Sequence, residues 1–376
     1  SISEFGTHDE LIESDGIYRS LYKNKFEDSP STKKTITKSK SLYVPRFDDE
    51  FNSSLVVDSW YKKSLWLYLL YPFALAVSYF TGRKRRKFLK NSFKKYKSEV
   101  PIIIVGNLTI GGTGKTPLVK YIATELIKLG YKPGIVSRGY GGKFKETLKV
   151  TNETPVKQTG DEAQILSTLN IPFYIDKNRV RALKTLNDNH NCDVIISDDG
   201  LQHYNMNRDV EIVVIDGKRR FGNNLSFPAG PLRESLKRLD SVDFIVNNSG
   251  PTEDGEHLMN VSPAKFIHLK SGKSYSVEDW PMHKQVHAVA GLGNPGRFFD
   301  LLARLGFDIT RNPFPDHHNF ISEDVHYLDH LPIIMTEKDA SKCKDFDNNK
   351  IWYLTIEAEV SSRFIEELDS KLKNLL

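Results

Sequence analysis

A continuous apolar segment leads directly into a glycine-rich turn in the first third of the chain. The segment reads VPIIIVG at positions 100–106, and it is followed by GNLTIGGTGKTP at 106–117 and by VKYIATELIKLG at 119–130. The first part has the composition of a strand buried on both faces, and the last has helical spacing and ends on a glycine. A buried strand, a tight turn and a helix in this order predict one unit of a parallel α/β sheet.

Further apolar segments repeat this pattern and divide the chain into two parts. The other expected strands of the first part are 132–139, 192–199, 210–217 and 243–248, with helical stretches between some of them. This alternation predicts an α/β fold with a doubly wound, mostly parallel sheet over residues 99–259. A second, smaller α/β domain is expected over 260–376, built from 266–272, 286–293, 297–306 and 332–340 and closed by an amphipathic helix at 360–376.

The glycine-rich turn has the residues of a phosphate-binding loop, or P-loop. In such a loop, glycines let backbone N–H groups surround phosphate oxygens, a lysine reaches the β and γ phosphates, and the next hydroxyl ligates Mg²⁺. Gly114, Lys115 and Thr116 match these positions, although Thr109 stands where the strict pattern has another glycine. A connection without chemical function would leave the Lys-Thr pair at the helix start unexplained. We therefore predict a P-loop NTPase-like site for ATP and Mg²⁺ formed by Thr109, Ile110, Gly111, Gly112, Thr113, Gly114, Lys115 and Thr116.

Two adjacent carboxylates follow another predicted strand. Asp198 and Asp199 end the segment CDVIISDD, where the carboxyl edge of the sheet is expected. A MgATP site usually takes an acidic residue from the end of a strand beside the P-loop, and such a carboxylate binds the metal directly or through water. These two residues are therefore candidate metal ligands, with an ordinary Asp-Asp-Gly turn as the alternative.

An uncharged segment of 19 residues, at 64–82, precedes the P-loop. It is long enough to span a membrane, but Pro72 lies inside it, Tyr, Ser and Thr dilute it, and positive charge flanks both ends. The next segment, 83–97, holds nine basic residues and no acid; the whole chain has a net charge of +5, so the remainder carries −4. We expect residues 58–98 to form a membrane-interface helix with a basic belt on an anionic membrane surface. A buried core helix and a single membrane span are the alternatives.

The first 57 residues differ from the rest of the chain. They are rich in Ser, Lys, Asp and Glu and show no sustained helical or strand period. This composition predicts a mostly disordered extension, of native or engineered origin, over residues 1–57. The whole chain is 39% hydrophobic, which gives the remainder enough apolar material for a packed core.

Eight short motifs occur in the same order as in a known enzyme family. They are GNLTIGGTGKTP (106–117), SRGYGG (137–142), TGDEAQIL (159–166), SDDGLQH (197–203), PAGPLRE (228–234), GNPGRFF (293–299), FPDHHNF (314–320) and TEKDA (336–340). Together they closely resemble the tetraacyldisaccharide 4′-kinase family over roughly residues 60–376, including an N-terminal membrane helix. Each motif alone is weak, whereas eight in order are highly specific.

The resemblance implies an activity and its catalytic residues. The activity is ATP-dependent phosphorylation of the 4′-hydroxyl of a tetraacylated glucosamine disaccharide 1-phosphate, giving lipid IVA at the cytoplasmic face of the bacterial inner membrane. By the same resemblance, Asp161 is the base that accepts the hydroxyl proton, and His317, favoured over His318, is its partner from the second domain. Closure of a cleft is expected to bring the pair together over MgATP, with Lys115 as the third catalytic residue. A helix-capping role for Asp161 is the alternative.

The remaining site residues are implied more weakly. Glu234 is expected to join Thr116, Asp198 and Asp199 around Mg²⁺, and the expected substrate-binding residues are Arg138, Tyr140, Glu162, Gln202, His203 and Arg233. The two arginines suit phosphates of ATP or of the lipid, because a planar guanidinium binds such oxygens in pairs. The other four are expected to line the cleft. Lys338 is expected to form an ion pair within the second domain and is left outside the site.

Two other functions fit parts of the sequence. A P-loop phosphotransferase or ligase acting on a soluble metabolite gives no reason for an interfacial helix followed by nine basic residues. A nucleotide-dependent membrane switch needs no acceptor base, so Asp161 and His317 would be dispensable in it. The expected partners are the lipid A disaccharide precursor and an anionic membrane surface. Nucleic acid is not expected, because the basic segment contains no recognised nucleic-acid-binding module, and no obligate protein partner is evident.

Overall fold

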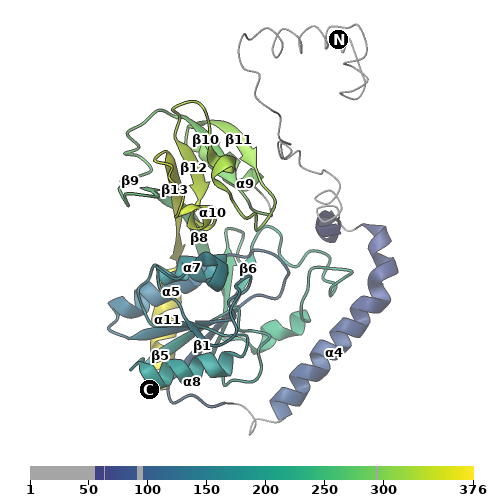
Figure 1. Cartoon of the computed structure of the whole chain (residues 1–376). Helices are drawn as coiled ribbons and strands as arrows, with labels where there is room; N and C mark the ends of the chain where they lie inside the picture. The colour runs from purple at the N-terminus through teal and green to yellow at the C-terminus, as the bar shows by residue number, and fades with distance from the viewer. Residues whose placement is uncertain (1–55, 63, 91–95, 294) are drawn as a thin grey trace, which may run out of the picture. The chain divides into compact units, whose positions relative to one another are not determined.

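The computed structural model of the protein describes residues 56–62, 64–90, 96–293 and 295–376 (Figure 1). Residues 1–55 of the extension expected at 1–57 lie outside the described residues. Residues 56–62 form a short helix. Lys94 and Lys95 of the basic segment also lie outside the described residues.

The P-loop region, which we define as residues 99–259, is built on a parallel sheet. Its strands are β1 (Ile102–Gly106), β2 (Pro133–Ser137), β3 (Leu148–Lys149), β4 (Phe173–Ile175), β5 (Val194–Asp198), β6 (Val210–Asp216) and β7 (Phe244–Asn248). β1 lies between β5 and β6 and is parallel to both, and the short β3 is antiparallel to β4. The predicted mostly parallel α/β sheet is therefore confirmed.

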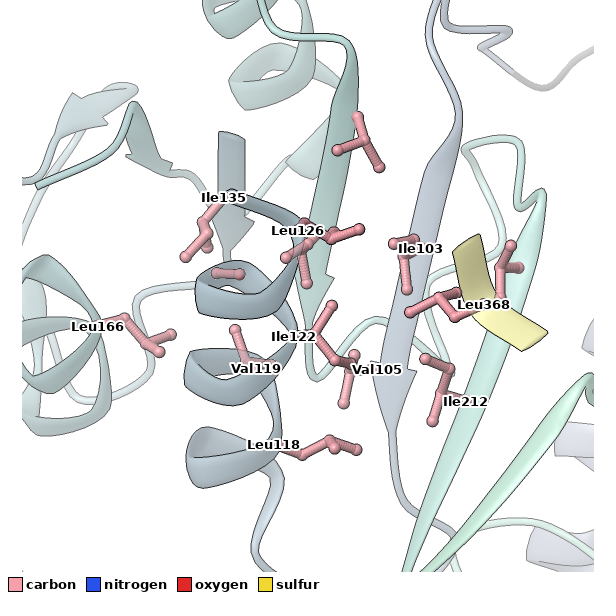
Figure 2. Close-up of a cluster of buried hydrophobic side chains, with 14 of the residues drawn as sticks. Ile103, Val105, Leu118, Val119, Ile122, Leu126, Ile135, Leu166, Ile212 and Leu368 are labelled. Atoms are coloured by element: carbon pink, nitrogen blue, oxygen red, sulfur yellow. The ribbon is translucent and has the colours of Figure 1, made fainter. Parts of the chain in front are cut away.

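Helices cover both faces of this sheet. α5 (Lys115–Lys128), α7 (Asp161–Ser167) and the closing α11 (Ser362–Lys373) pack on one face. α8 (Arg179–Asn189) and the short η3 (Leu236–Ser241) pack on the other, and α6 (Val156–Thr159) directly precedes α7. Successive side chains of a strand point to opposite faces, so Ile103 and Val105 of β1 pack against α5, as Figure 2 shows, while Ile102 and Ile104 belong to the opposite core. All four are fully buried, which explains the unbroken apolar run.

The C-terminal region, which we define as residues 260–376, continues the same sheet. Its strands are β8 (Glu256–His268), which begins just before it, β9 (Ser274–Ser276), β10 (Gln285–Ala290), β11 (Asp308–Pro313), β12 (Ile333–Thr336) and β13 (Ile351–Val360). Its further helices are α9 (Gly296–Arg304), η4 (Ser322–Val325), α10 (Glu337–Ala340) and η5 (Ser341–Cys343). Within the described residues the strand order is β11-β10-β12-β13-β8-β7-β6-β1-β5-β2-β4-β3, with β9 beside β8.

β8 connects the two regions. Its first residues pair in parallel with β7, and its later residues pair antiparallel with β13. The domain boundary predicted between residues 259 and 260 falls inside this strand. The division into two domains stays a prediction, and the structure adds that one sheet runs through both.

The apolar segment before the P-loop region forms an exposed helix. It begins as the 3₁₀-helix η1 (Leu65–Leu70) and continues as α4 (Tyr71–Lys90), with Pro72 in the first turn of α4, where its missing N–H costs no hydrogen bond. Leu65–Lys90 is long and apolar enough to cross a membrane, yet only 11% of its most apolar window is buried. The alternative of a buried core helix is therefore wrong. Large apolar side chains are exposed at Leu65, Trp66, Tyr68, Leu69, Tyr71, Phe73, Leu75, Tyr79 and Phe80.

Two side chains near the C-terminal end of α4 contact the P-loop region. Arg85 Nη2 donates a hydrogen bond to Ser241 Oγ (2.7 Å), and Phe88 stacks on Tyr204 with 5.8 Å between ring centroids. The apolar part of the helix lies before these contacts in the chain. Most of its large apolar side chains are exposed, whereas the basic end is attached to the P-loop region.

Candidate active site

The glycine-rich turn between β1 and α5 is held in shape by two asparagine side chains. Asn107 Nδ2 donates to the Thr109 carbonyl (2.8 Å), and Asn248 Nδ2, at the end of β7, donates to the Thr113 carbonyl (3.0 Å). Gly114 precedes α5 with a φ of 96°, in the left-handed region that favours glycine. A Cβ at this position would lie 2.5 Å from Asn248 Nδ2. The turn therefore requires glycine for both its conformation and its packing.

Lys115 is the first residue of α5, where the free N–H groups of a helix attract anions. Its Nζ lies 3.5 Å from Asp199 Oδ1, and Arg233 Nη1 lies 3.3 Å from the same oxygen. Burial alone would raise the pKa of Asp199, but the positive charges of Lys115 and Arg233 outweigh it and hold that pKa below its usual value. Asp199 is thus ionised, and it holds both cations beside the turn.

Asp198 has a different environment from its neighbour. It ends β5, is 1% exposed, and accepts one long hydrogen bond on Oδ2 from Ser137 Oγ (3.4 Å). Its Oδ1 has no hydrogen-bond partner among the described residues. Burial first, and then the negative charges of Glu162 and Asp199, raise the pKa of Asp198 to about 7. The positive charges of Lys115 and Arg179 offset only part of this effect, and the Asp198 side chain forms no ion pair within the described residues.

These carboxylates fit a magnesium ion. Carboxylate oxygens suit Mg²⁺, and in nucleotide sites the ion is bound by one or two carboxylates together with waters and phosphate oxygens. The described residues contain no group of three His, Cys, Asp or Glu side chains that could hold a metal. Mg²⁺ in a nucleotide site needs only one or two carboxylate ligands from the protein, and Asp198 and Asp199 meet this need. The Oδ1 atom of Asp198, which has no hydrogen-bond partner among the described residues, is available as a ligand.

The two predicted catalytic residues meet across the two regions. Asp161 begins α7, and His317 lies in the loop that follows β11. His317 Nδ1 is 3.1 Å from Asp161 Oδ2, although 156 positions separate them in the chain. Burial alone would raise the pKa of Asp161, but the hydrogen bond with His317 and the ammonium group of Lys342 outweigh it and lower that pKa. The Asp161 carboxylate is therefore ionised and oriented by an imidazole.

The neighbouring histidine is bound within its own region. His318 Nε2 lies 2.8 Å from Asp324 Oδ2, and its ring packs against Phe314 and Phe320 at 4.8 Å between centroids. His317 instead has a positive φ of 58° and approaches the Tyr140 ring at 6.3 Å. His317 contacts Asp161, and its catalytic role stays a prediction.

A known family model matches most of the chain. The family model described as tetraacyldisaccharide-1-P 4′-kinase, LpxK, matches residues 66–373 of the chain. This chain belongs to the tetraacyldisaccharide 4′-kinase family. The match covers the exposed helix, the P-loop region and the C-terminal region.

Individual relatives agree with the family match. The tetraacyldisaccharide 4′-kinase of Ruthia magnifica is 46% identical over 284 residues, which cover 75% of this chain and 90% of that protein. The enzyme of the same name from Methylobacillus flagellatus is 41% identical over 319 residues, covering 84% and 95%. A crystal structure of an "apo" form of LpxK from Aquifex aeolicus in complex with ATP superposes with a TM-score of 0.71 at 25% identity, covering 82% of this chain and 99% of that one.

The structure places most of the other predicted residues of this tetraacyldisaccharide 4′-kinase family member around the same edge of the sheet. Gln202 Nε2 donates to the Asn107 carbonyl beside the P-loop (3.1 Å). Burial and the positive charge of Arg179 lower the pKa of His203 to about 4, so this imidazole is neutral. Arg138 follows β2 and is exposed, and Tyr140 is 71% exposed near His317. No contact of these side chains decides a substrate-binding role, which stays a prediction.

Glu234 lies in a different setting from the other predicted metal ligands. It is buried, and its Oε2 accepts a hydrogen bond from the Tyr204 hydroxyl (2.6 Å) and lies 4.0 Å from Arg238 Nε. Its contacts among the described residues are thus with an aromatic residue and an arginine. Its Oε1 has no hydrogen-bond partner among the described residues, and its metal-binding role stays a prediction.

Three basic residues of the site were not predicted from the sequence. Arg179 is 4% exposed, and its Nη2 donates to the backbone carbonyls of Asp198 (3.0 Å) and Asp199 (2.7 Å). Lys338 forms the expected ion pair within its own region, but it also lies 3.7 Å from Asp161 Oδ2. Lys342 lies 3.3 Å from the same oxygen. The TEKDA motif pointed to Lys338, whereas no motif marked Lys342 or Arg179.

Replacing Asp198 by asparagine is expected to stabilise the nucleotide-free protein while removing activity. The unfolded carboxyl ionises near its ordinary value and the folded one at about 7, so burial of the charge costs stability increasingly from pH 4 to pH 7 and fully above it. Asparagine avoids this cost. Thermal denaturation should show a Tm higher by roughly 2–4 °C at pH 8, which corresponds to about 1 kcal/mol, and a smaller gain at pH 5. A lower Tm at pH 8 would contradict the buried, unpartnered state of Asp198.

Proposed function

We propose that this protein transfers the γ-phosphoryl group of ATP to the 4′-hydroxyl of a tetraacylated glucosamine disaccharide 1-phosphate, forming lipid IVA. The observation that carries the proposal is the contact between Asp161 and His317. The chain also has the P-loop lysine, Lys115, and belongs to this kinase family. A P-loop by itself needs no such pair, since nucleotide binding requires no acceptor base. An enzyme that deprotonates a sugar hydroxyl does.

The chemistry assigns one task to each residue. The 4′-hydroxyl oxygen forms a bond to the γ phosphorus, the bond from that phosphorus to the leaving ADP oxygen breaks, and the hydroxyl proton passes to Asp161. His317 orients Asp161 through the hydrogen bond on Oδ2. Lys115 binds the β and γ phosphates at the start of α5, where charge develops during transfer.

Asp198 and Asp199, with the Thr116 hydroxyl from the first turn of α5, are the residues that would hold Mg²⁺. Mg²⁺ bound there neutralises charge on the phosphate oxygens. Arg233 reaches Asp199 and provides a further positive group for phosphates. Arg179, which holds both aspartate carbonyls, keeps the end of β5 in place.

The exposed helix suits a substrate that carries four acyl chains. The acceptor is an amphiphile that resides in a membrane, so the kinase has to work at a membrane surface. We propose that the apolar side chains of η1 and α4 insert into the interface and that the basic residues after them bind anionic head groups. This arrangement makes the enzyme a peripheral or monotopic protein on the cytoplasmic face of the inner membrane, where ATP is available.

Replacing Leu69 and Phe73 together by glutamate is expected to release the protein from vesicles. The two side chains are 79% and 64% exposed, and full burial of each in lipid is worth about 1.5–3 kcal/mol. Sedimentation with anionic phospholipid vesicles should show at least about a tenfold loss of binding. The KM for the lipid should rise while the KM for ATP stays constant. Leu328→Glu, at an isolated side chain that is 96% exposed, is the matched control and should bind as the unchanged protein does.

A direct assay tests the proposed function. The purified full chain is incubated in detergent with tetraacyldisaccharide 1-phosphate and ATP labelled at the γ position, and the lipid fraction is separated. Label in a product that migrates as lipid IVA is the expected result. Label found only in inorganic phosphate, or transferred only to water-soluble sugars offered as competitors, would rule the proposal out.

A further inference from the structure

Three groups of the C-terminal region meet on one oxygen of Asp161. Its Oδ2 lies 3.1 Å from His317 Nδ1, 3.3 Å from Lys342 Nζ and 3.7 Å from Lys338 Nζ. The two lysine side chains are only 9% and 18% exposed. The other carboxylate oxygen, Oδ1, makes no such contact among the described residues. One oxygen of the base is thus fully engaged and the other is left available.

We propose that Lys342 is a positioning residue that fixes Asp161 by Oδ2, so that Oδ1 faces the acceptor hydroxyl. The inference rests on the proposed function, because it takes Asp161 as the base. The terminal torsion of an aspartate is broad, so a carboxylate held by one hydrogen bond from His317 keeps rotational freedom. A second contact from a nearly buried ammonium removes that freedom. A fixed oxygen is what proton transfer over hydrogen-bond distance requires.

Lys342 is itself held by a buried carboxylate. Its Nζ lies 3.4 Å from Asp339 Oδ1, and Asp339 is fully buried. Asp339 Oδ2 accepts hydrogen bonds from the Gly291 N–H (2.9 Å) and from the Thr336 hydroxyl (2.7 Å). Buried charges are tolerated when they are paired and hydrogen-bonded. The chain of contacts from Asp339 through Lys342 to Asp161 therefore gives the ammonium group one defined place.

Gly291 connects this chain of contacts to the histidine loop. A Cβ on Gly291 would lie 3.1 Å from Asp339 Oδ1 and 3.2 Å from the carbonyl of Pro315, two residues before His317. The backbone that carries His317 and the carboxylate that holds Lys342 are therefore packed on the same glycine. His317 and Lys342, two of the three groups that meet on Asp161 Oδ2, are thus positioned from one place in the C-terminal region.

A second ion pair joins the two regions without touching Asp161. Lys120 Nζ, on α5, lies 3.7 Å from Glu337 Oε1, on α10. Glu337 is adjacent in sequence to Lys338, so the pair crosses between the regions close to the site. Lys120 therefore provides a control for Lys342. If Lys342 only joined the two regions, its replacement should have the same effect as replacing Lys120. If Lys342 orients the base, the two replacements should have different effects.

The charged groups around Asp161 fix the direction of the pH effect. The groups that face it are His317 from the loop after β11, Lys338 from α10, Lys342 from η5 and Glu162 from its own helix, with Asp316 and Asp339 behind the lysines. Removing a positive charge near a carboxylate raises its pKa by about one unit. The acid limb of kcat should therefore move to higher pH when Lys342 loses its charge.

The test compares Lys342→Met, Lys342→Arg and the double variant Lys342→Met with Asp339→Asn. Lys342→Met should lower kcat about 10- to 100-fold with the KM for ATP unchanged, and its acid limb should shift upward by about one pH unit. Lys342→Arg keeps the charge and should recover most of kcat. The double variant removes the unpaired buried Asp339 charge, so it should regain Tm but not kcat. Lys120→Met is the matched control, with kcat within about twofold of the unchanged enzyme and an unmoved acid limb.

Several results would overturn the inference. They are a normal kcat in the double variant, a loss of kcat in Lys342→Met with an unmoved acid limb, and equal losses in Lys342→Met and Lys120→Met. Carboxyl ¹³C titration of Asp161 measures the same charge effect without turnover. If the unchanged enzyme does not phosphorylate the lipid, the proposed function fails; an Asp161 pKa that does not rise in Lys342→Met defeats the inference independently.

Discussion

Replacing Lys115 by methionine should reduce kcat about 1000-fold, the loss found when one preorganised donor to a developing charge is removed. Lys115 is the first residue of α5. Its side chain is 10% exposed, and its Nζ lies 3.5 Å from Asp199 Oδ1. Methionine keeps most of the length of the lysine side chain and removes its terminal ammonium group. Initial rates of label transfer to the lipid, measured at saturating MgATP, report the loss.

A second lysine of the same helix provides the control for Lys115→Met. Lys128→Met, which breaks an exposed pair with Glu125 at the other end of α5, should leave kcat unchanged. Asp199 keeps Arg233 as a partner in Lys115→Met, so the variant should fold with a Tm close to that of the unchanged protein. A well-folded Lys115→Met enzyme with kcat within tenfold of normal would remove Lys115 from the catalytic set.

The P-loop was predictable because its information is local. Strand, turn and helix are adjacent in the chain, and the requirement for glycine at Gly114 follows from one φ angle and one close neighbour. The carboxylates at the end of β5 were placed by the same logic, since a parallel neighbour of β1 must end at the same edge. The pattern did not reveal how the two differ: Asp199 forms ion pairs with Lys115 and Arg233, whereas the buried Asp198 forms none within the described residues. That difference depends on Arg233 and Lys115, which come from other elements.

Residues that act across the two regions were harder to predict. The pairing of Asp161 with His317 came from family resemblance, because no local pattern relates positions so far apart. Lys338 was expected to pair within its own region, and it does so with Asp316, but the same ammonium also approaches Asp161. A lysine near the end of a short helix has many possible partners, and only the packing of α10 against α7 selects among them.

The boundary between the regions shows a second limit of sequence patterns. Residue 260 was chosen where the strand and helix order changes, yet β8 runs from Glu256 to His268 without interruption. Its alternation of buried and exposed side chains describes a strand but does not say that the strand pairs with β7 at one end and with β13 along the rest. A strand shared in this way makes the two regions move only as far as one sheet can bend or twist.

Replacing Asp161 by asparagine should reduce kcat by about 100- to 10,000-fold, the range supplied by a positioned general base. The KM for ATP should hardly change, because the contacts of the Asp161 side chain among the described residues are with His317, Lys338 and Lys342, outside the P-loop. Burial alone would raise the pKa of Asp161, but the neighbouring His317 and Lys342 outweigh this effect and lower the pKa below its usual value. The carboxylate is therefore ionised throughout the neutral range, and its contribution to stability is lost only as the pH falls through that lowered value.

The two members of the catalytic pair should not act independently. His317→Ala frees Asp161 Oδ2 from its 3.1 Å contact and is expected to lower kcat nearly as far as Asp161→Asn, since residues that act as a unit lose their joint effect when either is removed. The double variant should then be no slower than Asp161→Asn alone. Asp300→Asn, which breaks an exposed pair with Arg311, is the control for a lost carboxylate. Multiplicative losses in the double variant would mean that His317 acts on the substrate separately, and the roles assigned to the pair would have to be divided.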